Sequence, residues 1–247
     1  PIRIAKVTDH EQESFDTILK DRTIGVLSDF STSSRTLMIA FGGIVGELGI
    51  PAFEFFNLSN NFPCNKIYIR DLEQAWYHSG IPGLGKSIEE IAQNLRAVIV
   101  EHNAQRVVTL GNSMGGYAAL LFGQLIDADA THAFAPQTFI DPHTRSATCD
   151  YRWARQVDRV HRLPSSTAPY FDLHDLLANS DMQTHHHIHY CSSDHLDVEH
   201  AIRLANLPNT VLHTYESGGH AVVRHLRDTG QLKKLLASAL GVEPLSV

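Results

Sequence analysis

The chain has few cysteines and no excess of positive charge. Only three of its 247 residues are cysteine, namely Cys64, Cys149 and Cys191, and they are far apart and in no Cys-x-x-Cys arrangement. An odd and scattered set of this kind argues against a disulfide framework or a zinc ribbon. The formal net charge is −7, so the chain has no overall basic excess to attract a phosphate backbone or an anionic membrane. We therefore expect no nucleic-acid partner and a protein of the reducing cytoplasm.

Long apolar runs are also missing. The most apolar region, residues 37–56, is interrupted by Glu47, Pro51 and several glycines, so it does not qualify as a membrane span. Acidic side chains are spread through the first thirty residues, which leaves no apolar segment typical of a secretory signal. With 43% apolar residues, a chain of 247 residues can bury a large core. We predict one soluble α/β domain over residues 1–247.

Strand and helix patterns alternate along most of the chain. A continuous apolar run predicts a strand at 36–41, and further strands are predicted at 66–70, 106–112, 131–136, 185–191 and 210–215. A capping box at Ser87 begins a helix through about Ile99, and further helices are predicted at 114–126, from about Val198, and at 221–239. This order favours a mostly parallel central sheet with helices on both faces.

The most specific pattern is the pentapeptide Gly-Asn-Ser-Met-Gly at residues 111–115. It directly follows a predicted strand and precedes a predicted helix, which is the context that a nucleophile elbow requires. Glycines on both sides of Ser113 leave room for a strained, sharp turn, and the amide of Met114 at the start of the helix can stabilise an oxyanion. Ser113 is thus a candidate nucleophile.

A serine nucleophile needs a base, and the base needs an orienting acid. Among 16 histidines, His220 alone combines a strand end, a Gly-Gly loop and a position near the end of the chain. Two aspartates, Asp194 and Asp197, follow the strand at 185–191, at the sheet edge where catalytic groups gather. Asp197 stands where a helix N-cap is expected, so we favour Asp194 as the acid and keep Asp197 as the alternative.

The order Ser113, acid, His220, with these strand and loop contexts, resembles the α/β-hydrolase superfamily over roughly residues 36–240. The elbow is similar to that of small bacterial serine esterases. The resemblance implies an α/β-hydrolase fold, a catalytic triad and no cofactor. It also implies that the stretch of residues 141–183 is a lid insertion in the single domain.

The resemblance also suggests which residues surround the nucleophile. Phe41-Gly42-Gly43 occupies the place of a His-Gly pair found in many relatives, so Gly43 would join Met114 in the oxyanion hole. The phenylalanine departs from that pattern and leaves the donor open among Gly42, Gly43 and Ile44. Four residues at or near strand ends are expected to bind substrate, namely Phe41, Gly42, Trp76 and Gln137. For Trp76 a place in the core is an equal alternative.

The histidine-rich stretch at 185–189 does not predict a metal site, because no acidic or cysteine side chain completes a ligand set at useful spacing. The sequence therefore predicts a serine hydrolase of the carboxylesterase type, acting on a small-molecule ester or acyl substrate through an acyl-enzyme. The alternatives are an acyltransferase or thioesterase with the same intermediate, or a binding module without chemistry. The oligomeric state is left open.

Overall fold

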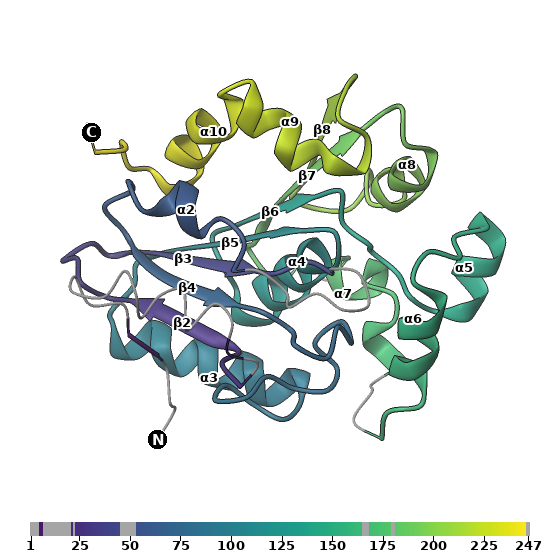
Figure 1. Cartoon of the computed structure of the whole chain (residues 1–247), viewed down its shortest axis with the longest axis horizontal. Helices are drawn as coiled ribbons and strands as arrows, with labels where there is room; N and C mark the ends of the chain where they lie inside the picture. The colour runs from purple at the N-terminus through teal and green to yellow at the C-terminus, as the bar shows by residue number, and fades with distance from the viewer. Residues whose placement is uncertain are drawn as a thin grey trace.

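The fold is taken from a computed structural model of the chain, which describes residues 5–6, 21, 23–44, 53–164, 168–178 and 181–245. The described residues form a single eight-stranded sheet of order β1-β2-β4-β3-β5-β6-β7-β8 (Figure 1). Its strands are β1 Ala5–Lys6, β2 Val26–Asp29, β3 Thr36–Phe41, β4 Asn65–Ile69, β5 Arg106–Asn112, β6 Ala130–Phe134, β7 His185–Cys191 and β8 Thr210–Tyr215. Among the strand pairs, only β2 with β4 is antiparallel. The predicted mostly parallel sheet is therefore confirmed.

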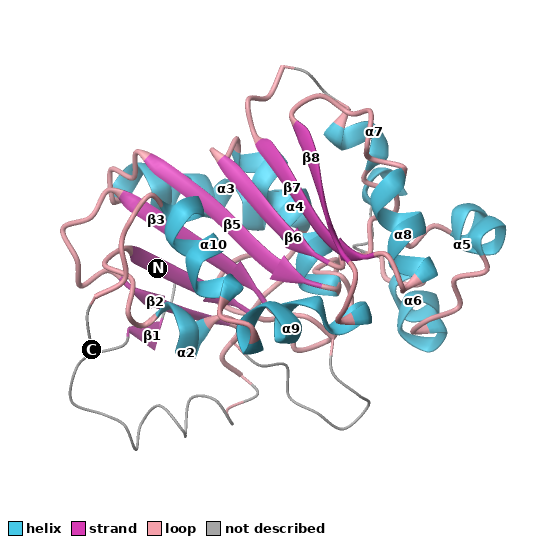
Figure 2. Ribbon diagram, turned by 90° about the horizontal axis from the view of Figure 1, so that it is seen from above, coloured by secondary structure: helices cyan, strands magenta, loops and turns pink. Residues whose placement is uncertain are grey.

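Helices cover both faces of the sheet, as Figure 2 shows from above. On one face, the helices α9 (Val222–Asp228) and α10 (Gln231–Leu240) form a buried apolar cluster with side chains of β3 and β5. The short helix α2 (Phe56–Ser59) packs against this cluster. A larger cluster on the other face joins α3 (Ile88–Glu101), α4 (Met114–Ile126) and α8 (His195–Ile202). The central strands are covered on both sides, which explains their continuous apolar runs.

Most of the predicted elements are present, with shifts at their ends. The Ser87 side chain accepts a hydrogen bond from the amide of Glu90, as the capping box predicts. The predicted helix from Val198 begins earlier, at His195, because Asp194 caps it. The C-terminal helix predicted as one piece is divided by Gly230, whose φ of 71° breaks the helical path between α9 and α10.

Between β6 and β7 the chain leaves the sheet at its carboxyl-terminal edge. The segment contains α5 (Pro142–Thr148), α6 (Ala154–His161), the short 3-10 helix η1 (Ala168–Tyr170) and α7 (His174–Leu177). In Figure 1, α5 and α6 project beyond the sheet on the side of β7 and α8. No helix within the described residues is long and apolar enough to cross a bilayer.

Candidate active site

The turn between β5 and α4 holds Ser113 in a backbone conformation that few side chains adopt. Ser113 has φ 56° and ψ −119°, and it is almost fully buried. A Cβ at position 111 would lie 1.9 Å from the carbonyl oxygen of Gly115, and one at position 115 would lie 2.3 Å from that of Phe41. Both glycines are thus required by close backbone packing, and the turn has the geometry of a nucleophile elbow.

His220 lies between Ser113 and Asp197. It comes from the short 3-10 helix η2 (Gly219–Ala221), directly after Gly218, whose φ is 114°. Its Nε2 is 3.0 Å from Oγ of Ser113, and its Nδ1 is 2.9 Å from both carboxylate oxygens of Asp197. Since an ionised carboxylate only accepts hydrogen bonds, Nδ1 carries the proton and Nε2 is free to accept one from the serine hydroxyl.

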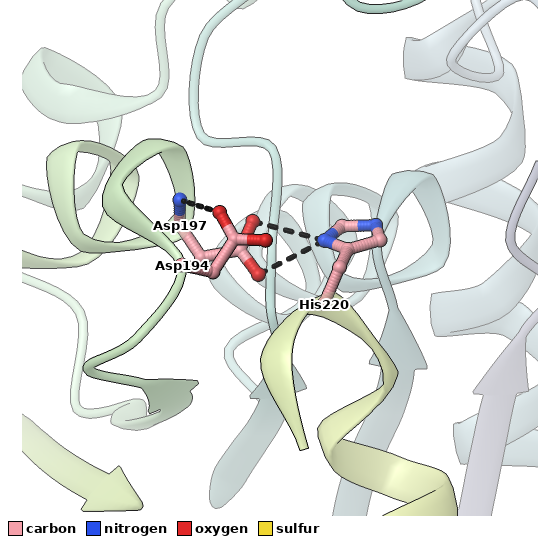
Figure 3. A group of neighbouring side chains, drawn as sticks. All are labelled: Asp194, Asp197 and His220. Atoms are coloured by element: carbon pink, nitrogen blue, oxygen red, sulfur yellow. Dashed lines mark hydrogen bonds and ion pairs between the residues drawn. The ribbon is translucent and has the colours of Figure 1, made fainter. Parts of the chain in front are cut away.

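The two aspartates exchange the roles that the sequence suggests. Asp194 is the N-cap of α8, and its carboxylate accepts a hydrogen bond from the amide of Asp197 at 3.1 Å. This bond and the contact between Asp197 and His220 are drawn in Figure 3. The preference for Asp194 as the partner of His220 is therefore wrong. The helix begins three residues earlier than expected, so its first turn carries Asp197 toward the histidine.

Asp197 is fully buried and is also paired with Arg152. Nη1 of Arg152 donates to Asp197 at 2.8 Å, while its Nε and Nη2 bind Asp150 at 3.1 and 2.7 Å. Burial alone would raise the pKa of Asp197, but the hydrogen bonds from His220 and Arg152 outweigh it and hold that pKa below its usual value. Asp197 is thus kept as a carboxylate, which is the form that orients an imidazole.

A second buried pair, Asp150 and His200, holds Arg152 in place on the side away from Asp197. Asp150 accepts a hydrogen bond from Nε2 of His200 at 2.9 Å, and the amide of Thr138 donates to Nδ1 of the same ring at 3.0 Å. These two partners fix the ring as the neutral tautomer with its proton on Nε2. The hydrogen bonds from His200 and Arg152 overcome burial and lower the pKa of Asp150. The segment before α6 is therefore tied to α8 by a chain of charged contacts.

In the loop after β3, the backbone amides of Gly42 and Gly43 already face acceptor groups of the protein. The amide of Gly42 donates to the carbonyl of Ile69 at 2.8 Å, which removes Gly42 from the possible oxyanion donors. The amide of Gly43 faces the carboxylate of Glu54, as does the amide of Asn112. Burial raises the pKa of Glu54 to about 7 in spite of these two amides. The predicted donor Gly43 therefore lies beside an acidic side chain.

Two of the expected substrate-binding side chains are part of the core. Phe41 is fully buried, stacks on Phe122 with ring centroids 5.3 Å apart, and meets the edge of Tyr77 at 5.6 Å. Trp76 is also fully buried, within the larger apolar cluster. The expectation that these two rings line a pocket is wrong, because their strand and loop turn them inward. For Trp76 the alternative of a core position is the correct one.

The loop that buries Trp76 is held by one carboxylate. The side chain of Asp71 accepts hydrogen bonds from the amides of Ala75 and Tyr77 at 2.6 and 2.9 Å. Trp76 and Tyr77 both have positive φ, at 48° and 66°, so these bonds fix a backbone that would otherwise relax. The hydroxyl of Tyr77 in turn donates to the carbonyl of Gly42 at 2.9 Å. The loop thus supports the glycine turn after β3 from within the core.

Gln137 lies behind the nucleophile. Its amide donates to the carbonyl oxygen of Ser113 at 3.4 Å, and its side chain is buried. Its Oε1 has no hydrogen-bond partner among the described residues. The residue is therefore adjacent to the elbow, although its exposed fraction of 1% leaves little of it open to a substrate in this conformation.

Two cavities flank these residues. One, of about 480 Å³, is lined by His220, Arg152, Trp153, Ser193, Asp194, His195 and Leu196. The other, of about 430 Å³, is lined by Glu54, Asn112, Ala221, Arg224 and several apolar side chains from α2 and its approach. The second cavity is therefore bordered by Asn112, which precedes Ser113, and by Ala221, which follows His220.

Possible ligand atoms of Asp194, Asp197 and His220 lie within 4.8 Å of one another, which is close enough to consider a metal ion. The hydrogen bonds among these side chains favour a role in orienting His220 rather than in binding a metal ion. Asp197 is already paired with the Arg152 cation, and Nδ1 of His220 needs its proton to bind the same carboxylate. A cation placed here would compete with both contacts.

The sequence patterns did not predict Asp150, His200 or Glu54 as parts of the site. Arg152 belongs to a run of arginines at near-helical spacing, which indicates a solvated helix face or, alternatively, a surface that attracts an acidic substrate. In the structure Arg152 precedes α6 and turns inward to Asp197. For Glu54 a signal exists, because it is a lone charge within the apolar run Phe-Glu-Phe-Phe. Asp150 and His200 carry no local signal, since their partnership spans fifty residues.

The fold is that of known enzymes. The structure is similar to a capsule O-acetyltransferase of Neisseria meningitidis serogroup A, with a TM-score of 0.65 at 16% identity over 86% of this chain and 90% of that chain. Similarity also extends to MenH from S. aureus (TM-score 0.53, 17% identity, 85% of this chain and 94% of that chain). A bacterial brefeldin A esterase gives a TM-score of 0.57 at 15% identity over 87% of this chain and 72% of that chain.

No family model matches the sequence, and no curated protein resembles it significantly. The structural neighbours nevertheless define the architecture. This chain has the α/β-hydrolase fold, so the fold predicted from the elbow and the order of elements is confirmed.

Proposed function

We propose that the protein is a serine hydrolase that cleaves carboxylic esters through an acyl-enzyme on Ser113. The single observation that supports this most strongly is the contact chain from Oγ of Ser113 to Nε2 of His220, at 3.0 Å, and from Nδ1 to Asp197, at 2.9 Å. A serine, a base and an acid in this relation form a catalytic triad. The proposal takes Asp197 as the acid and leaves Asp194 as a helix cap.

In the proposed reaction Oγ of Ser113 attacks the ester carbonyl while His220 takes its proton. The tetrahedral oxyanion accepts hydrogen bonds from the Met114 amide, which begins α4, and from a second amide in the loop after β3. The Gly42 amide is bound to the carbonyl of Ile69 and the Gly43 amide faces Glu54, so the second donor is Gly43 once it turns from Glu54, or else Ile44. The C–O bond then breaks, and the histidine returns its proton to the leaving alcohol.

Water completes the cycle by the reverse sequence of proton transfers. It attacks the acyl carbonyl, loses a proton to His220, and Ser113 leaves with that proton as the carboxylic acid departs. The proposed lid is the segment 141–183 of a single domain. It reaches the triad through Arg152, so its position would affect which acyl group is accepted.

An acyltransferase is the second candidate, and one observation favours it. Among the structural neighbours above, the O-acetyltransferase has the higher TM-score, and the same acyl-enzyme would serve transfer to an alcohol. In that case an acceptor hydroxyl takes the place of water as the nucleophile. The chemistry of Ser113, His220 and Asp197 is the same in both candidates.

The test is steady-state turnover of p-nitrophenyl esters of increasing acyl length by the wild type and by Ser113→Ala. We expect the serine variant to lose activity by roughly a thousandfold or more while its circular dichroism and melting temperature stay unchanged. Analysis of products with and without an added alcohol separates hydrolysis from transfer. Full activity of a folded Ser113→Ala protein would refute the mechanism.

A further inference from the structure

The cavity of about 430 Å³ between α2 and α9 has polar walls that the proposed triad does not use. Its polar side includes Glu54 and Asn112, and its apolar side includes Phe53, Phe55 and Leu232. Asn112 is covalently adjacent to the proposed nucleophile. A molecule in this cavity would therefore contact the residue that precedes the proposed nucleophile and Ala221, which follows His220.

Glu54 is held in a fixed orientation. The amides of Gly43 and Asn112 face its carboxylate and act to lower its pKa, so this side chain lies between the loop after β3 and the elbow. The other carboxylate oxygen, Oε2, is buried and has no hydrogen-bond partner among the described residues. An oxygen in this state retains its full capacity to accept a hydrogen bond.

Asn112 has a second oxygen of the same kind. Its Oδ1 is buried and lacks a partner within the described part of the chain. A buried acceptor without a partner is destabilising, so two of them in side chains that line one cavity indicate a missing donor. The occupant of the cavity should therefore donate hydrogen bonds.

The cavity beside His220 differs in this respect. There Arg152 is engaged with Asp150 and Asp197, Asp194 with the amide of Asp197, and Ser193 with Cys191. The buried atom in that lining without a partner among the described residues is a donor, Nε1 of Trp153. Buried acceptors without a partner therefore distinguish the cavity at Glu54 and Asn112 from that one.

The charges around the cavity favour an occupant that donates its hydrogen bond from a hydroxyl group rather than from an ammonium group. Arg224 and Arg227 line the same cavity, and their positive charge disfavours a cation. The raised pKa of Glu54, near 7, means that it exchanges between carboxylate and carboxylic acid close to neutral pH. A hydroxyl can pair with either form, because it both donates and accepts. The apolar wall suits the carbon skeleton of a polyol or sugar.

We propose that this cavity binds the alcohol portion of the substrate, and that Glu54 and Asn112 accept hydrogen bonds from a hydroxyl group on it other than the reacting one. The inference rests on the proposed acyl-enzyme and specifies its alcohol as a polyhydroxyl compound. The same site would serve both ester cleavage and acyl transfer. The alcohol leaves when an ester acylates Ser113, and it attacks the acyl carbonyl when the acyl group is transferred, giving its proton to His220.

The experiment is acyl partitioning. The enzyme is acylated with p-nitrophenyl acetate in the presence of glycerol or propan-1-ol at equal concentration, and the ratio of acetate ester to free acetate is measured. Because both products come from one acyl-enzyme, the ratio does not depend on the rate of acylation. We expect the wild type to transfer to glycerol about tenfold more efficiently than to propan-1-ol.

Two variants address the two acceptors. Asn112→Leu removes the carboxamide at similar size and keeps the backbone amide, so we expect the preference for glycerol to disappear. Glu54→Gln replaces a charged acceptor with a neutral one, and the preference should fall about threefold. Glu101→Gln, at an exposed position at the end of α3, is the matched charge control and should keep the wild-type ratio.

The outcomes separate this inference from the proposed function. Equal transfer to glycerol and propan-1-ol by the wild type, or an unchanged preference in folded Asn112→Leu and Glu54→Gln, overturns the subsite while leaving the acyl-enzyme intact. Release of nitrophenol by Ser113→Ala at the wild-type rate overturns the acyl-enzyme itself.

Discussion

At the scale of single residues, the role of each side chain in the candidate site depends on the local hydrogen bonds that it already makes. Ser113 and His220 could be predicted because each has a local signature, a glycine-flanked turn and a glycine loop after a strand. The acid could not be assigned in the same way. Asp194 and Asp197 follow the same strand, and only the position of the first turn of α8 decides which one caps the helix and which one faces His220.

We predict that the two aspartates have separable effects. Asp197→Asn should lower kcat/KM by on the order of ten-thousandfold, because an amide no longer holds the proton of His220 on Nδ1. Asp194→Ala should instead cost about 1 kcal/mol of stability through the lost cap of α8, with a much smaller effect on turnover. Parallel kinetics and urea unfolding of the two variants check this. A collapse of activity in well-folded Asp194→Ala alone would reverse the assignment.

At the scale of elements, two groups of contacts connect segments that are distant in the sequence. The first is the network of Arg152, Asp150 and His200, which ties the segment before α6 to α8. The second is a layer of imidazoles across β6, β7 and β8. In it His132 lies 3.1 Å from His189, and His187 lies 3.0 Å from His213, nitrogen to nitrogen.

Arg152 should matter for stability as well as for the site. Asp150 and Asp197 are almost completely buried, so Arg152→Met leaves two buried carboxylates without their cation. We expect a loss of about 3 kcal/mol in the free energy of unfolding, together with reduced turnover. The exposed Arg162 at the end of α6 offers the control, since Arg162→Met should change stability by less than about 0.5 kcal/mol. Similar unfolding midpoints for both variants would contradict the network.

The imidazole layer should make the sheet sensitive to acid. Burial, followed by the neighbouring His187, lowers the pKa of His132 to about 3, and burial also lowers the pKa of His189. A depressed folded-state pKa means that the unfolded chain binds more protons, so stability falls as the pH drops from about 6.5 toward 3. Urea unfolding at pH 7.5 and pH 5 measures the loss. His132→Phe should show a smaller loss than the wild type, and an equal loss would contradict this origin.

The predicted elements were right where a local pattern determines them, and wrong where a tertiary contact does. The strands at 36–41, 106–112, 185–191 and 210–215 have the predicted bounds. In 36–41 and 106–112 the apolar run matches the buried stretch of the strand, whereas no residue of 210–215 is buried. The sequence could not show that Phe41 and Trp76 turn into the core. Their orientation depends on Asp71, which binds the amides of the following loop, and on the rings packed against them.

At the scale of the whole molecule, the fold brings three separate loops to one edge of the sheet. The elbow after β5, the start of α8 after β7 and the loop after β8 lie side by side at the carboxyl ends of parallel strands. This is the general location of sites in open α/β sheets. The segment between β6 and β7 contributes Arg152 from outside the sheet. The proposed function thus depends on the topology as much as on the motif.

The cysteines provide a simple check on the global structure. None of the three is in a disulfide; Cys64 and Cys191 are buried, and Cys149 is exposed. A thiol reagent should therefore modify one group rapidly in the native protein and three in denaturant, and a reductant should not change the melting temperature. Rapid reaction of all three thiols without denaturant would contradict this packing.

The proposed mechanism requires that Ser113 becomes acylated. The most direct measurement is stopped-flow release of nitrophenol from p-nitrophenyl acetate, combined with intact mass spectrometry of the quenched enzyme. We expect a burst that matches the enzyme concentration and an acetyl group on Ser113, both absent in Ser113→Ala. Turnover of the wild type without any adduct at Ser113, or an equal burst in Ser113→Ala, would contradict the mechanism.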